Sequence, residues 1–291
     1  MTRAQSVALA IGAGVFLSLL GVGTRLLEDT SAFKLVYYRS IGLVLFLTPI
    51  ILYTNKNSLG ATIKAIGFNE ALASICLVGT SIFVVLALMN TAVANAMFVI
   101  SLAPLVAGIF AWIALREQLR FSTIIAIVIS IVGVLIIVND SLSTNGLLGI
   151  LYAFAMLFCY GLFSVTLRRG RGQDMLPCVV IHGFILILAL PIFIQDLSIS
   201  QYDLILCLSL GVFQLGLGML MFTAASKGIP AAQLVLLAML EVVLSPVWVW
   251  LIVGEAPSQS SLIGGGIIIT AICFQAITTM RDDRIQQPQT S

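Results

Sequence analysis

Residues 91–138 read TAVANAMFVISLAPLVAGIFAWIALREQLRFSTIIAIVISIVGVLIIV: a proline-containing apolar helix, an Arg-Glu elbow and a second apolar helix. A similar stretch begins at Ile229 and reads IPAAQLVLLAMLEVVLSPVWVWLIVGEAPSQSSLIGGGIIITAICFQAI. The glutamate that both stretches share, Glu117 and Glu255, is the strongest evidence of a repeat, because matches among apolar residues arise easily by chance. A period of this length indicates a duplicated unit of several helices and predicts two related halves, 1–139 and 140–291. At a constant offset of 138 residues the matched pairs are Ala94/Ala232, Leu102/Leu240, Trp112/Trp250, Glu117/Glu255 and Ser122/Ser260.

The composition is that of a membrane protein. Of 291 residues, 60% are hydrophobic and 9% are charged, whereas about a quarter of the residues of a soluble domain are charged. Apolar runs of about 20 residues, the length of a membrane-crossing helix, recur along the whole chain. Their length and lack of alternation favour helices over strands. We therefore predict an all-α integral membrane protein with ten transmembrane helices, at about 4–27, 34–53, 67–90, 92–115, 122–139, 145–168, 176–195, 202–226, 230–253 and 259–280.

The basic residues predict the orientation of the chain in the membrane. With the N-terminus in the cytoplasm, the inner side receives eleven lysines and arginines and the outer side only Arg25 and Lys34; Arg39, inside a span, completes the fourteen. This distribution obeys the positive-inside rule and makes both termini cytoplasmic. Each half has five helices, an odd number, so the two halves insert upside down relative to one another. Inverted repeats of this kind are typical of carriers that alternate between two access states.

Three groups of residues carry a family likeness: Ala103-Pro104-Leu105 followed by Trp112 and Glu117, then Glu241 followed by Trp250 and Gly254-Glu255, and finally Arg39. Through these residues the chain resembles, over its whole length, the EamA-type branch of the drug/metabolite transporter superfamily. Within that branch it is most similar to the YddG-like bacterial exporters of aromatic and other neutral amino acids. The resemblance implies a ten-helix fold of two inverted five-helix repeats around a central cavity, in the bacterial inner membrane.

The second half departs from the family pattern at one point. Family members often have Glu-Pro where this chain has Glu241-Val242, and here the proline follows later, at Pro246. Pro104 and Pro246 each remove a backbone donor from a predicted span. They are therefore candidate hinges for a conformational change, with a static kink as the alternative reading.

Glu241 is the strongest candidate for a functional side chain. It lies near the middle of the ninth predicted span, where a charged and unpaired carboxylate costs on the order of 2.5–3.5 kcal/mol. Two functions fit such a residue, namely coupling to protons and binding of a substrate amine. The alternative is a protonated glutamate that is hydrogen-bonded to a neighbouring helix.

Arg39 and His182 are the other titratable candidates inside predicted spans. Arg39 lies close to the outer end of its helix, so snorkelling or pairing with Glu28 or Asp29 is expected, with a clamp for a substrate carboxylate as the alternative. His182, the single histidine, could titrate near neutral pH and gate a carrier. A packed, hydrogen-bonded histidine is the simpler reading.

Three amides and one tryptophan complete the candidate binding residues. Asn95 and Gln233 occupy matching positions in the two halves, which predicts a shared site near the centre; hydrogen bonds between helices are the equal alternative. Gln214 and Trp248 are candidates for the lining of a cavity. The five cysteines stand singly in apolar segments, so we expect no metal site and no disulfide framework. We predict no cofactor, no nucleotide motif and no nucleic-acid partner.

These features together predict a secondary transporter, not an enzyme, that exports amino acids by alternating access. Its partners would be the substrate, the lipid bilayer and possible coupling protons. A carrier of drugs, nucleosides or other metabolites on the same scaffold remains the main alternative; nucleotide sugars would require more buried cations than Arg39 alone. An intramembrane enzyme would need a paired constellation that one glutamate and one histidine do not supply. A receptor or scaffold would give no reason for an inverted duplication.

Overall fold

The computed structural model describes residues 2–54, 67–116, 118, 121–143, 146–169, 175–229 and 231–286, and every regular element within these ranges is a helix. The elbow residues Glu117 and Arg120 lie outside the described residues. The helices are α1 (Arg3–Leu17), α2 (Leu19–Leu26), α3 (Ala32–Thr54), α5 (Phe68–Asn90), α6 (Val93–Ile100), α7 (Ala103–Leu115), α8 (Phe121–Ser143), α9 (Leu147–Arg169), α10 (Met175–Ala189), η1 (Leu190–Ile192), α11 (Gln201–Ser209), η2 (Leu210–Leu217), α12 (Gly218–Ser226), α13 (Ala231–Val253) and α14 (Gln259–Gln286).

Eight stretches of the described chain are long and apolar enough to cross a membrane. Two further apolar helices, Leu176–Ile192 and Met239–Val253, are shorter. Large aliphatic side chains on the outer face of α8, such as Val128, Ile131 and Leu135, are more than half exposed. Such a surface requires hydrocarbon and not water around it. The all-helical, multi-span character predicted from composition is therefore confirmed.

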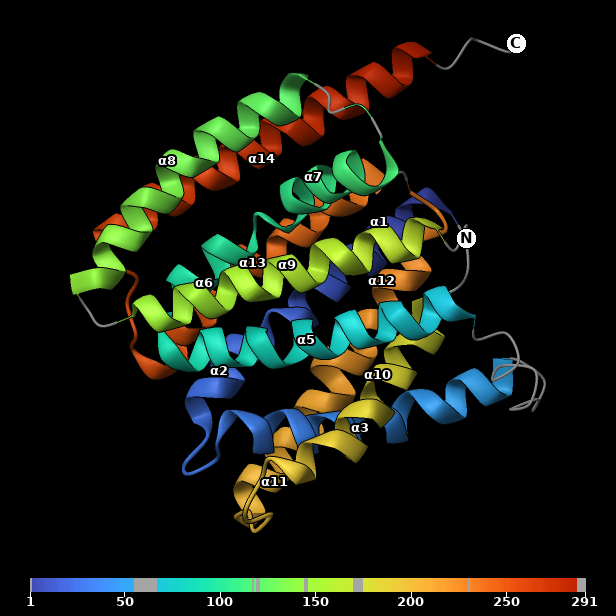
Figure 1. Cartoon of the computed structure of the whole chain (residues 1–291), viewed down its shortest axis with the longest axis vertical. Coiled ribbons are helices and arrows are strands. Elements are labelled where there is room, and N and C mark those ends of the chain that lie inside the picture. Colours follow the sequence, from blue (N-terminus) through green and yellow to red (C-terminus); the bar gives the residue numbers. More distant parts are fainter. Residues whose placement is uncertain are drawn as a thin grey trace.

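Helices that are far apart in the sequence lie side by side (Figure 1). α8 runs along α14, α5 runs along α9, and α3 packs against α10 and η2. α1 packs against both α12 and α13. The start of α1 and the end of α14 lie on the same side of the molecule, which we call the terminus end; the opposite side, where α2 ends and α5 turns into α6, is the latch end (Figure 1). The predicted tight hairpin is confirmed, because α5 ends at Asn90 and α6 begins at Val93.

Several of the membrane helices are interrupted. α1 gives way to α2 at Ser18, and α6 gives way to α7 at Ser101-Leu102. Pro104 is the second residue of α7, a position at which its missing N–H leaves no helical bond unmade. Pro246 lies inside α13, which continues as one helix from residue 231 to 253. The two candidate hinges therefore occupy different settings: one follows a break and the other does not.

The two copies of the repeated stretch end their first helix in the same way. α7 is followed directly by Arg116 with φ 56°, and α13 is followed directly by Gly254 with φ 80°. These two left-handed residues are 138 positions apart, the offset of the repeat. Left-handed backbone is cheap for glycine and strained for arginine.

Arg116→Gly should raise the free energy of unfolding by about 1 kcal/mol, because glycine adopts the left-handed conformation without strain from a Cβ. Gly254→Ala should lower it by a similar amount for the converse reason. Unfolding of both variants in detergent micelles checks the pair, and shifts of the same sign in both would contradict it.

Two glycines let α3 approach η2 and α11 at backbone distance. A Cβ at Gly211 would overlap the carbonyl oxygen of Arg39, and one at Gly42 would overlap the carbonyl oxygen of Leu208. Neither neighbour can rotate away, because both are main-chain atoms. This close packing fixes the backbone at Arg39, which belongs to the candidate site described below.

Gly211→Ala should lower the midpoint of thermal unfolding in detergent, at a cost of about 1–3 kcal/mol for forced overpacking. Gly266→Ala is the matched control, because a Cβ there meets no atom within 4 Å. The same loss in both variants would show that helix-to-backbone packing at Gly211 is not the cause.

Candidate functional site

A polar cluster that we call the latch joins segments from the two ends of the chain. Arg25, near the end of α2, donates from Nε to Glu255 Oε2 at 2.6 Å and from Nη2 to Glu255 Oε1 at 3.4 Å. Its Nη1 and Nη2 also donate to the carbonyl oxygens of Leu88 (2.5 Å) and Thr91 (2.8 Å). The Val93 N–H donates to Glu255 Oε1 at 2.8 Å. The latch therefore ties α2 and the α5–α6 turn to the loop between α13 and α14.

Asn95 belongs to a second polar cluster beside the latch. Its Nδ2 donates to Ser141 Oγ at 3.1 Å, and its Oδ1 accepts a hydrogen bond from the Ser261 hydroxyl. All three side chains are buried. Asn95 thus connects α6, α8 and α14 by hydrogen bonds, which is the second of the two roles expected for it from the sequence.

A third cluster at the latch end centres on Asp203, which is buried at the start of α11. Its carboxylate accepts the N–H groups of Glu28 (3.1 Å) and Asp29 (3.3 Å) and the hydroxyl of Thr30 (2.6 Å). These bonds fasten the loop between α2 and α3 to the second half of the chain.

At the terminus end, two hydrogen bonds between distant segments of the described chain are exposed. Arg3 donates to Gln233 at 3.3 Å, and Arg169 donates to the Ala114 carbonyl at 3.2 Å. Gln233 therefore contacts Arg3 near the N-terminus, whereas Asn95 lies in the polar cluster beside the latch. The structure does not bring the two matching amides into one site.

Three spans meet at the interruption between α1 and α2. Ser18 accepts the indole N–H of Trp248 at 3.0 Å and donates to the Val15 carbonyl at 2.7 Å. Gln214 donates from Nε2 to the Leu17 carbonyl at 3.3 Å. Gln214 lies in η2, a π-helical segment, and such segments often occur at functional sites. Gln214 and Trp248, both candidates from the sequence, are thus brought to the same place.

Glu241 lies on α13 beside this interruption. Gly14 of α1 packs directly against α13 here, since a Cβ at Gly14 would stand 3.2 Å from Leu240 Cβ and 3.6 Å from the Glu241 nitrogen. Glu241 is partly exposed and has no hydrogen-bond or ion-pair partner among the described residues. One turn later, on the same face of the helix, Ser245 is buried and its hydroxyl also has no partner in the described structure.

The expectation that Arg39 snorkels to the surface or pairs with Glu28 or Asp29 is wrong. Arg39 is only 2% exposed, and its Nε has no hydrogen-bond partner in the described structure. Arg39 lies seven residues after the first residue of α3. Its backbone packs against Gly211, and this contact holds the residue inside the protein. A buried guanidinium without an acidic partner is costly, so the residue calls for an explanation other than stability.

His182 is packed and hydrogen-bonded, as the simpler reading of the sequence expected. It is 2% exposed, and its Nε2 lies 3.2 Å from the Ser81 hydroxyl. Its Nδ1 is hydrogen-bonded to the Val179 carbonyl. With both ring nitrogens occupied, His182 connects α10 to α5.

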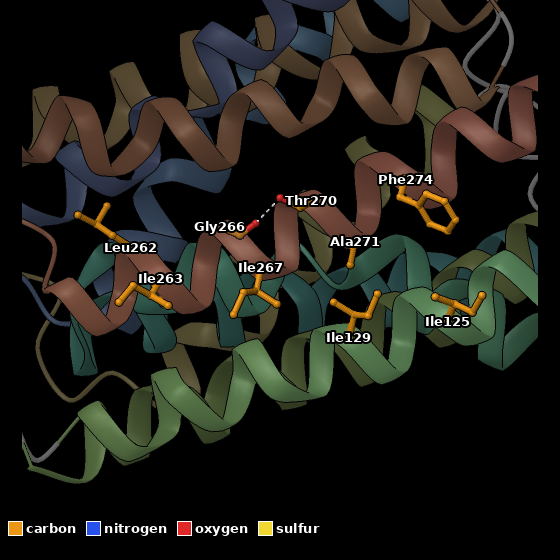
Figure 2. A pocket seen from close by; sticks show the side chains of 9 residues that line it. All are labelled: Ile125, Ile129, Leu262, Ile263, Gly266, Ile267, Thr270, Ala271 and Phe274. Carbon is orange, nitrogen blue, oxygen red and sulfur yellow. Dashed lines mark hydrogen bonds between the residues drawn. The ribbon is translucent and has the colours of Figure 1, made fainter.

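A groove of about 630 Å³ lies between α8 and α14 and is almost wholly apolar. In Figure 2, Ile125 and Ile129 of α8 face Ile267 and Ala271 of α14. The single hydroxyl in the lining, that of Thr270, donates to the Gly266 carbonyl at 2.7 Å. The groove suits hydrocarbon and offers no free polar group for a charged solute, so it is not the candidate site.

Several residues of the site had no signal in the sequence. Ser18 and Ser245 are serines inside apolar runs, and such residues usually serve packing. Arg25 was assigned only as an outer basic residue, although Glu255 stood out through the repeat. The contact between Arg25 and Glu255 spans 230 positions, and no local pattern indicates it.

Comparisons with known proteins agree with this architecture. The profile of the EamA-like transporter family matches residues 5–139 and 147–276. An uncharacterized transporter of Clostridium kluyveri is 27% identical over 176 residues, which are 55% of this chain and 56% of that relative, so the match spans about half of each. A protein of known crystal structure superposes with a TM-score of 0.70 at 18% identity, covering 96% of this chain and all of that one, which shows a shared fold. The two matches of the family profile together cover most of the sequence, and the chain belongs to the EamA-like transporter family.

Proposed function

We propose that the protein is a secondary transporter that exports aromatic and other neutral amino acids across the bacterial inner membrane by alternating access. In this proposal ten spans form two inverted five-helix halves, 1–139 and 140–291, with both termini in the cytoplasm. The two segments matched by the family profile, residues 5–139 and 147–276, support this division. The excess of basic residues in the loops assigned to the cytoplasm supports the orientation.

One observation carries the choice of substrate. Among the described residues, Arg39 is the arginine that is buried, and Glu241 is a carboxyl group near the middle of a span; neither has a hydrogen-bonding or charged partner in the described structure. Charges at membrane depth are costly and usually mark a transport pathway. A solute that carries one negative and one positive group would satisfy both residues. An amino acid with an apolar side chain has this distribution and suits the surrounding apolar helices.

The polar clusters support alternating access. Arg25–Glu255, Asn95–Ser261 and Asp203 with the Glu28–Thr30 loop all connect the two halves at the latch end. Carriers with inverted repeats open one end while the other is closed. In this proposal the structure represents the state that is closed at the latch end, which is the outer side, and export requires these bonds to separate.

Purified protein in liposomes should take up labelled phenylalanine, methionine and threonine in a saturable way. Arg39→Met should reduce uptake at least tenfold, because the substrate carboxylate loses its partner. The same variant should keep or raise the thermal midpoint, because Met fills the space and removes a buried charge that has no partner.

A fall in the thermal midpoint of Arg39→Met that parallels the loss of uptake would assign Arg39 a structural role and remove the argument for its function. Empty liposomes are the control, and a pH gradient across the membrane tests for proton coupling. Absence of uptake of all three amino acids would favour a carrier of drugs, nucleosides or other metabolites on the same scaffold.

Breaking the latch should lower the stability of the protein. Arg25→Ala leaves Glu255 with the Val93 N–H as its one partner among the described residues. This change should lower the free energy of unfolding by about 2 kcal/mol, as for other hydrogen bonds to charged groups. Arg25→Ala combined with Glu255→Ala should lose less than the sum of the single changes, since the two residues act together. Additive losses in this double-mutant cycle, measured by unfolding in detergent, would show that the pair does not act as a latch.

A further inference from the structure

The interruption between α1 and α2 exposes hydrogen-bond acceptors inside the membrane. A helix that breaks frees carbonyl groups that a continuous helix would use. Here the Leu17 carbonyl is taken by Gln214 Nε2, and the Ser18 hydroxyl accepts the Trp248 indole N–H. Both contacts come from spans in the second half of the chain. Side chains therefore satisfy the polar groups at the break. These bonds also determine which polar atoms of the same side chains are left without a partner.

The bond from Gln214 to Leu17 determines which atom of the amide is left over. Because Nε2 donates to the Leu17 carbonyl, Oε1 is the free atom; it is buried and has no partner in the described structure. Gln214 as a whole is only 2% exposed. An amide oxygen is an acceptor with no donor function, so the group that satisfies it must carry an N–H or O–H.

Ser245 of α13 contacts the first turn of α2, just after the break. A Cβ at Gly21 would overlap Ser245 Oγ, and Gly21 lies one helical turn after Leu17. Ser245 is 1% exposed, and its hydroxyl has no partner in the described structure. Glu241 precedes it by one turn on the same face of α13 and supplies a carboxylate that is partly exposed and has no partner in the described structure.

We propose that Glu241, Gln214 and Ser245 form a subsite for a primary ammonium group beside the break between α1 and α2. The proposal rests on the function given above and deepens it, since the ammonium group is the α-amino group of the transported solute. An ammonium group has three donors and no acceptor. The subsite offers it three acceptors, namely one carboxylate, one amide oxygen and one hydroxyl. The number of acceptors equals the number of donors, and the negative charge of the carboxylate is opposite to that of the ammonium group.

The charge distribution separates this subsite from Arg39. Arg39 lies on α3, where its backbone contacts Gly211 at the start of η2, and Gln214 lies three residues further along η2. The π-helical segment therefore connects the position of the guanidinium with the ammonium subsite. The carboxylate of the solute is expected at Arg39 and its amine at the ammonium subsite. A carboxylate would be repelled by Glu241, and an amine would be repelled by Arg39.

Binding of three compounds to the purified full chain tests the subsite: phenylalanine, 2-phenylethylammonium, which lacks the carboxylate, and 3-phenylpropionate, which lacks the amine. Isothermal titration in detergent gives the dissociation constants. Glu241→Gln should weaken binding of 2-phenylethylammonium at least tenfold and leave that of 3-phenylpropionate unchanged within twofold. Phenylalanine should be weakened in parallel with the amine.

Ser245→Ala provides the cleaner variant, because its hydroxyl makes no bond in the described structure and its removal should leave folding intact. It should weaken binding of the amine about threefold to tenfold. Ser130→Ala is the matched control: Ser130 on α8 is equally buried and its hydroxyl is also without a partner in the described structure. The control should change neither constant.

Equal weakening of the amine and the carboxylate compound in Glu241→Gln, or no change in either, would overturn the subsite. So would a wild-type protein that binds no amine. Amine binding that depends on Glu241 in a protein that transports no amino acid would leave the subsite standing and remove the proposed function. Normal amino-acid uptake by Glu241→Gln would remove the subsite and leave the function standing.

Discussion

Backbone polar groups that are freed where a membrane helix ends or breaks must find partners inside the protein, because hydrocarbon offers none. The structure meets this constraint with charged and amide side chains from distant segments. Arg25 takes the carbonyls of Leu88 and Thr91 at the end of α5, and Glu255 takes the Val93 N–H at the start of α6. Gln214 takes the Leu17 carbonyl in the same way. Two of these bonds, from the Val93 N–H to Glu255 and from Gln214 to the Leu17 carbonyl, therefore join the two halves at helix ends.

This constraint makes the groups without partners informative. A protein that satisfies the backbone groups at its helix ends with side chains from 63 to 197 positions away leaves Arg39 Nε, Gln214 Oε1 and Ser245 Oγ without any bond in the described structure. Stability alone gives no reason to keep a buried guanidinium in such a setting. Binding of a solute supplies such a reason, because a bound solute would form hydrogen bonds with these groups. Residues that reduce stability in the empty protein are common at functional sites for this reason.

The fold was largely predictable from sequence, because long apolar runs and short polar linkers determine helices in a membrane. The Asn90–Val93 hairpin followed from the near absence of a linker. The interruption at Ser18 had no such signal, since neither glycine nor proline marks it. The sequence also led to a wrong prediction for Arg39, because its position near the end of an apolar run favoured exposure at the surface. Only the close packing at Gly42 and Gly211 shows why the residue faces the protein interior.

The candidate site was partly predictable for a related reason. Glu241, Gln214 and Trp248 were recognisable as polar or aromatic residues within apolar runs, and they do lie around one break. The expected pairing of Asn95 with Gln233 rested on their matching positions in the repeat. In the proposed inverted arrangement, matching positions near helix ends lie at opposite sides of the membrane. Repeat symmetry therefore separates such residues, and it brings together only those close to the midplane.

Alternating access is the central claim, and the distance across the latch tests it most directly. Spin labels placed at Ala92, in the α5–α6 turn, and at Pro257, in the loop after Glu255, would report that distance in protein reconstituted in lipid. The account predicts a short distance in the empty protein and a second, longer population when a transported amino acid is added. A single short distance that persists while the protein transports its substrate would contradict it.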